Sequence, residues 1–557
     1  MSTPQFCSKI KTYDRWEILF EKSSNATSVE FLKPDGTTET SETFIYQPAL
    51  FEYNDRGYES VTACGDELLA ARYTPDVVGD YKFTVYSDGN IVFSGEFCAE
   101  QGDWANSYVN VSKKDPRYFA LDNGECFFPI AINIVRPDSF PAASGTEFGR
   151  TNREDTMGLK QYEWFFKQFS KNGGNFVRLW LATPYFNVET DDPSEFNYLQ
   201  FTKLDEMVKL AKKYSIRLKF TFDYFRVFAS EKTENAIFCK TLKYKDHVCK
   251  SGSEWINSEL WQGFWFKKID EYIKRYAGDP TVFCFELWNE MNCFDATFEE
   301  VTDFTARALR YLHKKAPKNM SVNSLGSFDV STFTKCLDAF KMDEMSFQQL
   351  HRYLDQGAKI ELVRKDPIAL IKDGFEYVKR PDKPFILAET GAVNDCHSSY
   401  FRYYSFDHNG IIFTDVTYAP FFFESASTGQ IWHWTFYVDN KNLWKYYAPI
   451  ADMVKGENLD EQGLKSNDLS TDKAWILLLE GENNTYGYIK NKEVSWYNVI
   501  RDMNDVNVLG AFSVPLKHNG DLTVYNIWDD KDLNVEIEDK KLVISNLQNG
   551  ILFKIKK

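Results

Sequence analysis

Apolar and polar residues follow three successive patterns along the chain. In residues 1 to about 105, short runs such as GDYKFTVYS (79–87) and IVFSGEFCAE (91–100) alternate apolar and polar positions. Turn-forming residues such as Pro34-Asp35-Gly36 lie between the runs. Alternation with a period of two, interrupted by turns, predicts a small antiparallel β-sandwich, which we place at residues 1–108.

From about residue 113 to 455, short apolar runs alternate with amphipathic segments such as FTKLDEMVKLAKKYS, which predict helices. The runs are FFPIAIN (127–133), NFVRLWLA (175–182), IRLKFTFD (216–223), TVFCFELWNE (281–290), MSVNSLG (320–326), MSFQQLHRY (345–353), KPFILAETGA (383–392) and GQIWHWTFYV (429–438). Eight strands alternating with helices predict a (β/α)8 TIM barrel at residues 109–456. A doubly wound open sheet is the alternative, but it requires a glycine-rich phosphate loop, and AINIVRPDS is not one.

The third pattern returns to short strands. We expect strands at WILLLEG, TYGYIKN, SWYNVI, GDLTVYNIWD and LVISNL, and a second β-sandwich at residues 470–557. The polar stretch KGENLDEQGLKSNDLSTDK (455–473) reads as a linker. The predicted fold class is therefore α/β, a TIM barrel flanked by N-terminal and C-terminal β-sandwich domains.

Composition narrows the range of partners and compartments. The net charge of −16 argues against nucleic acid and anionic membranes as partners. No stretch approaches the ~20 apolar residues of a membrane span, and MSTPQFCSKIKTYDRWE has no signal-peptide core. The ten scattered cysteines show no zinc spacing, so we expect reduced, buried thiols in a cytoplasmic protein without a metal or a cofactor. Nothing in the sequence indicates the oligomeric state.

Polar residues gather where the predicted barrel strands end, which is where barrel enzymes carry their chemistry. The second strand ends near Arg178, and the fourth ends in Asn289 and Glu290. The remaining candidates are His351 and Tyr353 on the sixth strand, Glu389 on the seventh, and Trp432 and Trp434 on the eighth. We expect the two tryptophans to share one strand face, because side chains alternate along a strand.

Two glutamates facing each other across a barrel mouth suit glycoside hydrolysis. One carboxyl donates a proton to the leaving oxygen, and the other, ionised, attacks the anomeric carbon or activates a water molecule. Arg178 can hold one carboxylate ionised, and Asn289 can bind a sugar 2-hydroxyl. Glu286 lies deeper on the fourth strand, so we expect it to be a structural partner, and the sequence leaves open which carboxylate Arg178 holds.

Each candidate also has a structural interpretation. A single glutamate at a strand end is more often a surface ion pair or a helix cap than a catalyst. Arg178 fits a structural ion pair, and His351 fits a hydrogen-bonded core histidine. The functional interpretation depends on the combination, because the residues fall at the ends of different predicted strands.

These motifs together resemble a known family. The WNE at 288–290, the AETG at 388–391, the N-x-x-R at 175–178, the H-x-Y at 351–353 and the eighth-strand tryptophan resemble clan A retaining glycoside hydrolases. The likeness is greatest to glycoside hydrolase family 5, the cellulase and mannanase family, and it spans residues 113–455. The N-terminal part resembles, more weakly, the Ig-like module of some such enzymes, and the C-terminal part resembles their β-sandwich module.

The resemblance implies roles for these residues. Glu290 would be the general acid/base and Glu389 the nucleophile. Asn289 would contact the 2-hydroxyl and Arg178 would support Glu389, with His351, Tyr353 and a tryptophan, Trp434 rather than Trp432, completing the subsite. Many family members carry a histidine near the end of the third strand, where this chain has FDYFRVF, so the contacts on that side differ.

Two long loops, from Thr183 to about Tyr198 and from Tyr224 to about Glu259, leave the predicted active-site face. Loops of this length at such a face are usually lids or binding walls. We expect most of their aromatic residues to pack onto the barrel, namely Tyr185, Phe186, Tyr224, Phe225, Phe238, Tyr244 and Trp255. A walled site and a cytoplasmic location favour a short oligosaccharide substrate, with mannose or glucose units.

Three functions compete. The favoured one is a retaining β-glycosidase acting on β-linked oligosaccharides, with an endo-acting cellulase or mannanase type enzyme on polymer as the alternative within that class. A non-catalytic carbohydrate-binding protein on a barrel scaffold is another, but the intact glutamate pair counts against it. An aldolase-like enzyme would need a Schiff-base lysine or metal ligands at a strand end, and the sequence offers neither.

Overall fold

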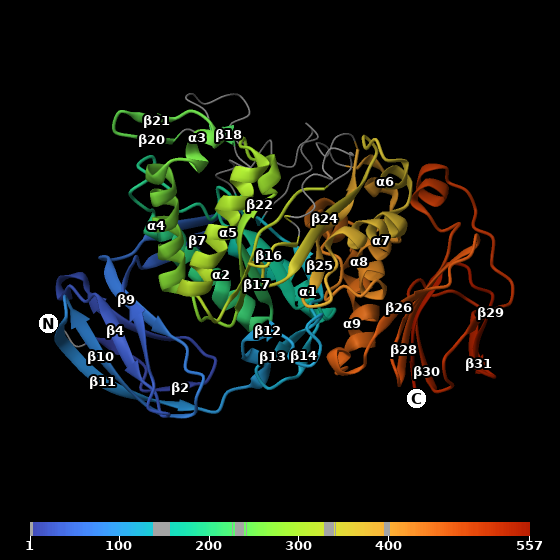
Figure 1. Cartoon of the computed structure of the whole chain (residues 1–557), viewed down its shortest axis with the longest axis horizontal. Coiled ribbons are helices and arrows are strands. Elements are labelled where there is room, and N and C mark those ends of the chain that lie inside the picture. Colours follow the sequence, from blue (N-terminus) through green and yellow to red (C-terminus); the bar gives the residue numbers. More distant parts are fainter. Residues whose placement is uncertain are drawn as a thin grey trace.

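The structure is a computed structural model of the chain, and it describes residues 4–137, 156–224, 227–228, 239–240, 242–327, 339, 341–394 and 401–557. Figure 1 shows a mixed α/β protein in three parts. Strands of the N-terminal part lie at one end, the helices and strands of the middle part lie in the centre, and the C-terminal strands lie at the other end.

Two sheets form the N-terminal part, with strand orders β1-β3-β9-β6 and β2-β11-β10-β4-β5. Their strands are β1 (Gln5–Phe6), β2 (Lys9–Lys11), β3 (Trp16–Glu21), β4 (Ser28–Leu32), β5 (Thr38–Glu42), β6 (Phe44–Tyr46), β9 (Leu68–Tyr73), β10 (Gly79–Ser87) and β11 (Asn90–Glu100). A separate hairpin joins β7 (Ala49–Tyr53) and β8 (Glu59–Ala63). Alternate residues of β3 and β10 are buried, and Trp16 and Tyr81 both stack on Phe97, which explains the period-two pattern.

A small antiparallel sheet follows and leads into the middle part. Its strands are β12 (Val109–Val111), β13 (Phe119–Leu121) and β14 (Cys126–Phe127).

Parallel strands organise the middle part. Five of them pair in the order β15-β16-β17-β22-β23, and β24 pairs with β25. Their bounds are β15 (Ala131–Asn133), β16 (Phe176–Trp180), β17 (Arg217–Tyr224), β22 (Val282–Asn289), β23 (Met320–Val322), β24 (Gln348–Asp355) and β25 (Phe385–Val393). Ile431 makes parallel bridges to both Ile132 in β15 and Thr390 in β25, so the first and last strands of the series are joined through it.

Helices separate these strands in sequence and pack around them (Figure 1). The long ones are α1 (Leu159–Lys171), α2 (Tyr198–Lys213), α4 (Glu259–Tyr276), α5 (Phe298–Lys315), α7 (Pro367–Val378) and α8 (Ile411–Phe422), and the short ones are α3 (Gly252–Ile256), α6 (Glu361–Lys365) and α9 (Ala448–Val454). Helix α5 begins with a capping box, in which the Thr297 hydroxyl and the Glu300 carboxylate accept each other's backbone N–H.

Two further sheets form the C-terminal part. One has the order β26-β27-β28-β33-β30 and the other β29-β32-β31. Their strands are β26 (Lys465–Asp468), β27 (Ala474–Glu480), β28 (Asn484–Asn491), β29 (Phe512–Pro515), β30 (Asp521–Asn526), β31 (Asn534–Glu538), β32 (Lys541–Ser545) and β33 (Gly550–Lys556). Apolar residues of both sheets share one buried cluster.

Three sequence predictions of local structure are wrong. The predicted linker contains β26, whose polar residues suit an edge strand that is half exposed. The predicted strand SWYNVI is a π-helical turn, Trp496–Arg501, in which the Ser495 hydroxyl accepts the Asn498 N–H. The predicted eighth strand has only the Ile431 bridges, and a π-helical turn, Trp434–Asp439, follows. Trp432 and Trp434 therefore do not share a strand face.

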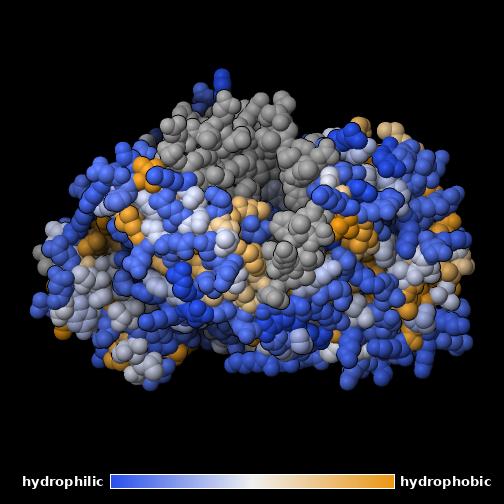
Figure 2. All heavy atoms as spheres, turned by 45° about the horizontal axis from the view of Figure 1, so that its top comes forward, coloured by the Kyte–Doolittle hydropathy of each residue, from blue (hydrophilic) through white to orange (hydrophobic). Residues whose placement is uncertain are grey.

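Surface features refine two more expectations. Cys7, Cys64 and Cys293 are exposed, so not all cysteines are buried. No helix within the described ranges is long and apolar enough to cross a membrane. The face shown in Figure 2 is largely hydrophilic, with scattered apolar patches.

Candidate active site

The structure brings most of the predicted site residues together at the carboxyl ends of four parallel strands. Arg178 comes from β16, Asn289 from the end of β22 with Glu290 directly after it, His351 and Tyr353 from β24, and Glu389 from β25. Parallel strands end at the same edge of a sheet, so residues far apart in sequence meet there.

Arg178 is fully buried and contacts two of these side chains, Glu389 and Asn289, together with the deeper Glu286. Its Nε donates to Glu286 Oε2 at 2.6 Å, its Nη1 forms an ion pair with Glu389 Oε1, and its Nη2 donates to Asn289 Oδ1 at 2.6 Å. The guanidinium fork allows this, because its donors point in fixed and different directions. Arg178 therefore holds both carboxylates, through different nitrogens.

Glu286 lies beneath the site in a fully buried polar layer. Besides Arg178, the Thr221 hydroxyl donates to its Oε2 at 2.5 Å and Gln349 Nε2 donates to its Oε1 at 2.8 Å. Burial alone would raise the pKa of Glu286, but attraction to Arg178 and Lys219 outweighs burial and holds that pKa well below its usual range. Glu286 is thus an ionised structural partner, as expected.

Lys219 completes this layer, and sequence reasoning missed it. Its Nζ donates to Gln349 Oε1 at 2.7 Å and lies 3.9 Å from Glu286 Oε2. Burial lowers the pKa of Lys219 to about 8, although Glu286 opposes that shift. One signal was available, because Lys219 and Thr221 alternate with the apolar residues Leu218, Phe220 and Phe222, so they lie on the opposite face of the strand from those residues.

Glu389 has a partner for each of its oxygens. Oε1 pairs with Arg178, and Oε2 accepts the Tyr353 hydroxyl at 2.9 Å, with His351 Nδ1 at 3.4 Å. Burial raises the pKa of Glu389 above that of an ordinary glutamate, although Arg178 and Tyr353 both oppose the shift. The carboxyl therefore changes charge at a higher pH than an exposed glutamate does.

Glu290 occupies an unusual backbone conformation. Its φ is 51°, a left-handed value that is costly for a residue with a side chain and is typical of functional sites. The Ser324 hydroxyl accepts the Glu290 N–H at 3.0 Å, and Glu290 Oε1 lies 3.0 Å from His351 Nδ1. The side chain is 14% exposed, more than that of Glu389, so it is the more accessible carboxyl of the two.

The ligand atoms of Glu290, His351 and Glu389 all lie within 4.8 Å of one another. Such a group could hold a divalent cation. However, Arg178 and Tyr353 already engage the two oxygens of Glu389. The positive charge of Arg178 beside this carboxylate also repels a metal cation. The arrangement is better suited to two carboxyls acting on a ligand between them.

Gly391 explains the glycine of the AETG motif. Its φ is 144°, and a Cβ at this position would lie 2.9 Å from the Tyr404 hydroxyl and 3.1 Å from His433 Nδ1. A larger residue would therefore clash with these rings and displace either them or the strand that carries Glu389.

The two tryptophans lie beside the site in different ways. The Trp432 N–H donates to the Thr390 carbonyl at 2.9 Å, next to Glu389, and the Trp432 ring lies 4.9 Å from that of Trp180. Trp434 packs at right angles against Trp432 and is only 1% exposed. Trp432, at 6% exposed, is thus the slightly more accessible ring of the two.

Most aromatic residues of the two long loops are buried, as expected. Phe186 and Trp255 are almost fully buried, and Tyr224 stacks on Trp180. Tyr244 packs against Phe264. Tyr185 is also buried, and the predictions for Phe225 and Phe238 lie outside the described residues.

Comparisons with known proteins show a shared fold. No family model matches the sequence, and no curated protein matches it. A structure described as a "putative glycoside hydrolase" from Bacteroides vulgatus ATCC 8482 is similar with a TM-score of 0.54 and 12% identity, over 99% of this chain and 100% of that chain. At this identity the likeness shows a common fold and nothing about activity.

Two further structures score lower. An exo-beta-1,4-mannosidase from Opitutaceae bacterium strain TAV5 gives a TM-score of 0.42 and 15% identity, over 62% of each chain. An endo-1,4-beta-mannanase from Rhizomucor miehei gives 0.39 and 16%, over 58% of this chain and 90% of that chain. Both TM-scores are below 0.5, so these two likenesses do not show a shared fold.

Proposed function

We propose that this protein is a retaining β-glycoside hydrolase, built on a (β/α)8 barrel, that cleaves β-linked oligosaccharides of mannose or glucose units. The observation that carries the proposal is the carboxyl pair at the ends of β22 and β25, with one oxygen of Glu290 within 4.8 Å of one oxygen of Glu389. Retaining enzymes hold their carboxyls roughly 5–5.5 Å apart, whereas inverting enzymes need a wider gap for a water molecule.

The strand order supports the barrel. The parallel strands follow one another in sequence, and the Ile431 bridges join β15 to β25. The description of the Bacteroides vulgatus structure agrees with a glycosidase. We place the domain boundaries at 1–108, 109–456 and 470–557, with sandwich domains on both sides of the barrel.

In the proposed mechanism Glu389 is the nucleophile. Its carboxylate attacks the anomeric carbon while Glu290 donates a proton to the leaving oxygen, which forms a glycosyl-enzyme ester and releases the leaving sugar. Glu290, now ionised, then takes a proton from a water molecule that attacks the same carbon and frees Glu389. Because Arg178 uses the Asn289 oxygen, the Asn289 amide N–H is the group that would bind the sugar 2-hydroxyl.

Trp432 is the better candidate for the sugar platform, because Trp434 is the more deeply buried of the two rings. His351 Nδ1 lies 3.0 Å from Glu290 Oε1 and 3.4 Å from Glu389 Oε2, so it would reduce the repulsion between the two carboxylates. His351 would also bind a sugar hydroxyl.

Aryl β-glycosides of mannose, glucose, xylose and galactose test the proposal with wild type, Glu290→Ala and Glu389→Ala. We expect wild type to cleave at least one of them and both variants to lose nearly all activity. Azide should rescue Glu290→Ala with a β-glycosyl azide product and Glu389→Ala with an α-glycosyl azide, since azide replaces water in the first case and the nucleophile in the second.

Glu299→Ala, an exposed glutamate on α5, is the matched control and should keep full activity. Unchanged activity in Glu389→Ala would overturn the nucleophile assignment. No cleavage of any aryl glycoside or β-linked oligosaccharide by wild type would favour a carbohydrate-binding protein instead.

A further inference from the structure

Lys219 is a buried charge with no role in the mechanism proposed above. Its side chain is fully buried on β17, where Lys219 pairs in register with Arg178 of β16. Its Nζ donates to Gln349 Oε1 at 2.7 Å and lies 3.9 Å from Glu286 Oε2. Lys219 therefore belongs to the same buried layer as the arginine that holds Glu389.

The Gln349 amide connects Lys219 to Glu286. A protonated lysine can only donate hydrogen bonds, so Gln349 turns its carbonyl oxygen towards Lys219 and its amide nitrogen away from it. That nitrogen donates to Glu286 Oε1 at 2.8 Å and to the Asn323 carbonyl at 2.9 Å. The lysine thus fixes the direction in which this amide faces Glu286.

The charges of this layer balance only when Lys219 is included. Two cations, Arg178 and Lys219, face two carboxylates, which belong to Glu286 and Glu389. Without the lysine charge one arginine would serve both carboxylates, and one of them would take up a proton, because an unpaired buried charge is costly. That proton would go to Glu389, whose pKa is already raised, whereas the pKa of Glu286 lies well below its usual range.

Lys219 and Glu389 affect each other's ionisation. Burial is the main reason that the pKa of Glu389 is raised, and the negative charge of Glu286 adds to the rise. Burial lowers the pKa of Lys219 to about 8, against the attraction of Glu286 and, more weakly, of Glu389. The lysine is therefore a cation below about pH 8, where it offsets the effect of Glu286 on Glu389.

Other titratable groups also face these two side chains. Those that face Lys219 are Arg178, Cys284, Glu286 and Glu389. Those that face Glu389 are Arg178, Glu286, His351, Tyr353 and, within 4.8 Å, Glu290. Burial raises the pKa of the Cys284 thiol well above its usual range, so this thiol stays neutral and does not offset the Lys219 ammonium.

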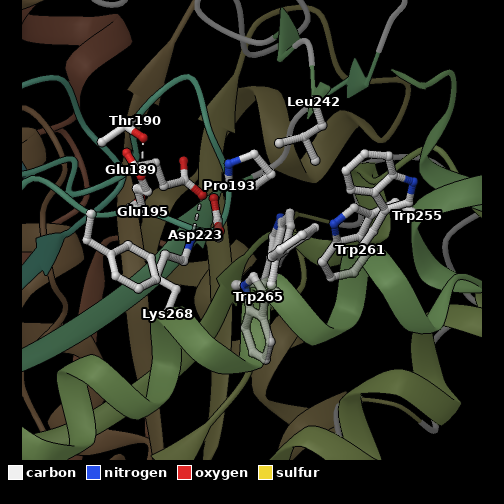
Figure 3. Close-up of a pocket in the computed structure, with 13 residues that line it drawn as sticks. Glu189, Thr190, Pro193, Glu195, Asp223, Leu242, Trp255, Trp261, Trp265 and Lys268 are labelled. Carbon is white, nitrogen blue, oxygen red and sulfur yellow. Dashed lines mark hydrogen bonds and ion pairs between the residues drawn. The ribbon is translucent and has the colours of Figure 1, made fainter. Parts of the chain in front are cut away.

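Another buried lysine of the middle part shows the geometry of a structural ion pair. Figure 3 shows Lys268 beside Asp223, and its Nζ lies 2.8 Å from Asp223 Oδ2 and 3.0 Å from Glu189 Oε1. That ammonium contacts both of its carboxylates directly. Lys219 instead reaches Glu286 at 3.9 Å and through the Gln349 amide, so direct ion pairing does not account for its position.

We propose that Lys219 is a positioning residue for the nucleophile: its ammonium balances Glu286, so that the charge of Arg178 keeps Glu389 ionised. Because Lys219 is fully buried, it acts through Glu286 and Arg178 and not on the sugar itself. The inference rests on the proposed function, in which Glu389 attacks as a carboxylate.

Lys219→Met tests the inference in the pH profile of kcat/KM for an aryl β-glycoside. Loss of a nearby positive charge raises the pKa of a carboxyl, so Glu389 would ionise only at higher pH. The acid limb should move up by roughly half to one pH unit, and kcat/KM on that limb should fall about three- to tenfold. Lys490→Met, which removes a buried lysine paired with Asp415 in the C-terminal part, is the matched control and should leave the limb in place.

The double variant Lys219→Met/Glu286→Gln separates charge balance from packing. It removes one cation and one carboxylate together, so the layer is neutral again and the acid limb should return close to its wild-type position. An acid limb that does not move in Lys219→Met, or that stays at higher pH in the double variant, would overturn the inference. If Lys219→Met does not fold, Lys219→Gln takes its place, because it keeps a donor for Gln349 without the charge.

Titration of the Glu389 carboxyl distinguishes a failure of this inference from a failure of the proposed function. Protein labelled with ¹³C at its glutamate carboxyls, with Glu389→Gln to assign the signal, reports the Glu389 pKa without substrate. If wild type cleaves no glycoside but this pKa is higher in Lys219→Met than in wild type, the proposed function fails and the effect of Lys219 on Glu389 stands. An equal Glu389 pKa in both proteins, in an active enzyme, overturns the role of Lys219 alone.

Discussion

Arg178 is the residue through which the two deepest carboxylates of the site are connected. Its Nε holds Glu286 and its Nη1 holds Glu389, so the position of the proposed nucleophile depends on a residue one layer below it. Sequence reasoning identified Arg178, Asn289 and both strand-end glutamates from the polar ends of apolar runs. It could not assign the partners of Arg178, since those are fixed by which side chains meet across the strands.

Glu286→Gln tests this connection. We expect the free energy of unfolding to fall by about 3–5 kcal/mol, because Arg178 and Lys219 lose a buried counter-charge. The value of kcat should fall more than KM rises, since Arg178 would hold Glu389 less firmly. Thermal unfolding and steady-state kinetics measure the two effects.

Thr221→Val is the matched control for Glu286→Gln, because it removes the hydroxyl that donates to Glu286 and accepts from Arg178 Nε but leaves the charge of Glu286. It should cost only about 1 kcal/mol. A Glu286→Gln variant with wild-type kcat would contradict a positioning role for Glu286.

Tyr353→Phe should change the pH dependence of activity. Burial raises the pKa of Glu389 and the Tyr353 hydroxyl opposes that shift, so removing the hydroxyl raises the pKa further. Attack requires the ionised carboxylate, so activity is lost as pH falls through this pKa. The acid limb of kcat/KM should therefore move to higher pH in the variant.

Tyr311→Phe, on α5 and bonded to Asp270, should leave the pH profile in place. An acid limb of Tyr353→Phe that stays in place or moves to lower pH would argue against Glu389 as the ionised nucleophile.

At the scale of elements, the spacing of apolar residues along the chain decided which elements the sequence could predict. Runs with a period of two gave β10 and β11 with nearly their observed bounds, and helical spacing gave α2 and α5. The strand predictions for the segments after Ile431 and after Ser495 were wrong. Both segments are rich in aromatic and β-branched residues, which favour strands, but both form π-helical turns. In the second segment the Ser495 cap and tertiary contacts overrode local preference, as with Trp496, whose indole N–H donates to the Lys365 carbonyl.

Helix α5 offers a prediction at this scale. Thr297→Ala removes the hydroxyl that caps the helix and should destabilise its first turn by about 1 kcal/mol. Hydrogen exchange of the first-turn amides should become faster, while hydrolysis stays unchanged. Thr302→Ala, whose hydroxyl donates to the Phe298 carbonyl within the helix, should not speed that exchange. Unaltered exchange in Thr297→Ala would show that packing alone fixes the helix start.

At the scale of the whole molecule, buried ion pairs tie the flanking parts to the middle. Arg72 of β9 holds Asp205 of α2 through two hydrogen bonds of 2.7 and 2.6 Å. Lys490 of β28 pairs with Asp415 of α8, where both side chains are buried. These contacts predict that the N-terminal and C-terminal parts do not move freely against the middle part.

Arg72→Met should lower the free energy of unfolding by about 3 kcal/mol, because buried Asp205 would keep only the more distant Arg15, at 3.8 Å, as a counter-charge. Lys22→Met removes an exposed pair with Glu67 and should cost less than about 1 kcal/mol. Calorimetry of both variants measures the difference. Equal effects of the two would mean that the Arg72 contact adds little to the attachment of the N-terminal part.

The sequence by itself determined the succession of strands and helices and the polar residues at the strand ends, because both follow from local periodicity. Only the tertiary structure decided that Arg178 holds both Glu286 and Glu389, that Lys219 lies beneath them, and that Trp434 is buried more deeply than Trp432. Arg178 and Glu389 are separated by 211 positions in sequence. Contacts at that separation depend on how parallel strands are placed side by side, which no local pattern encodes.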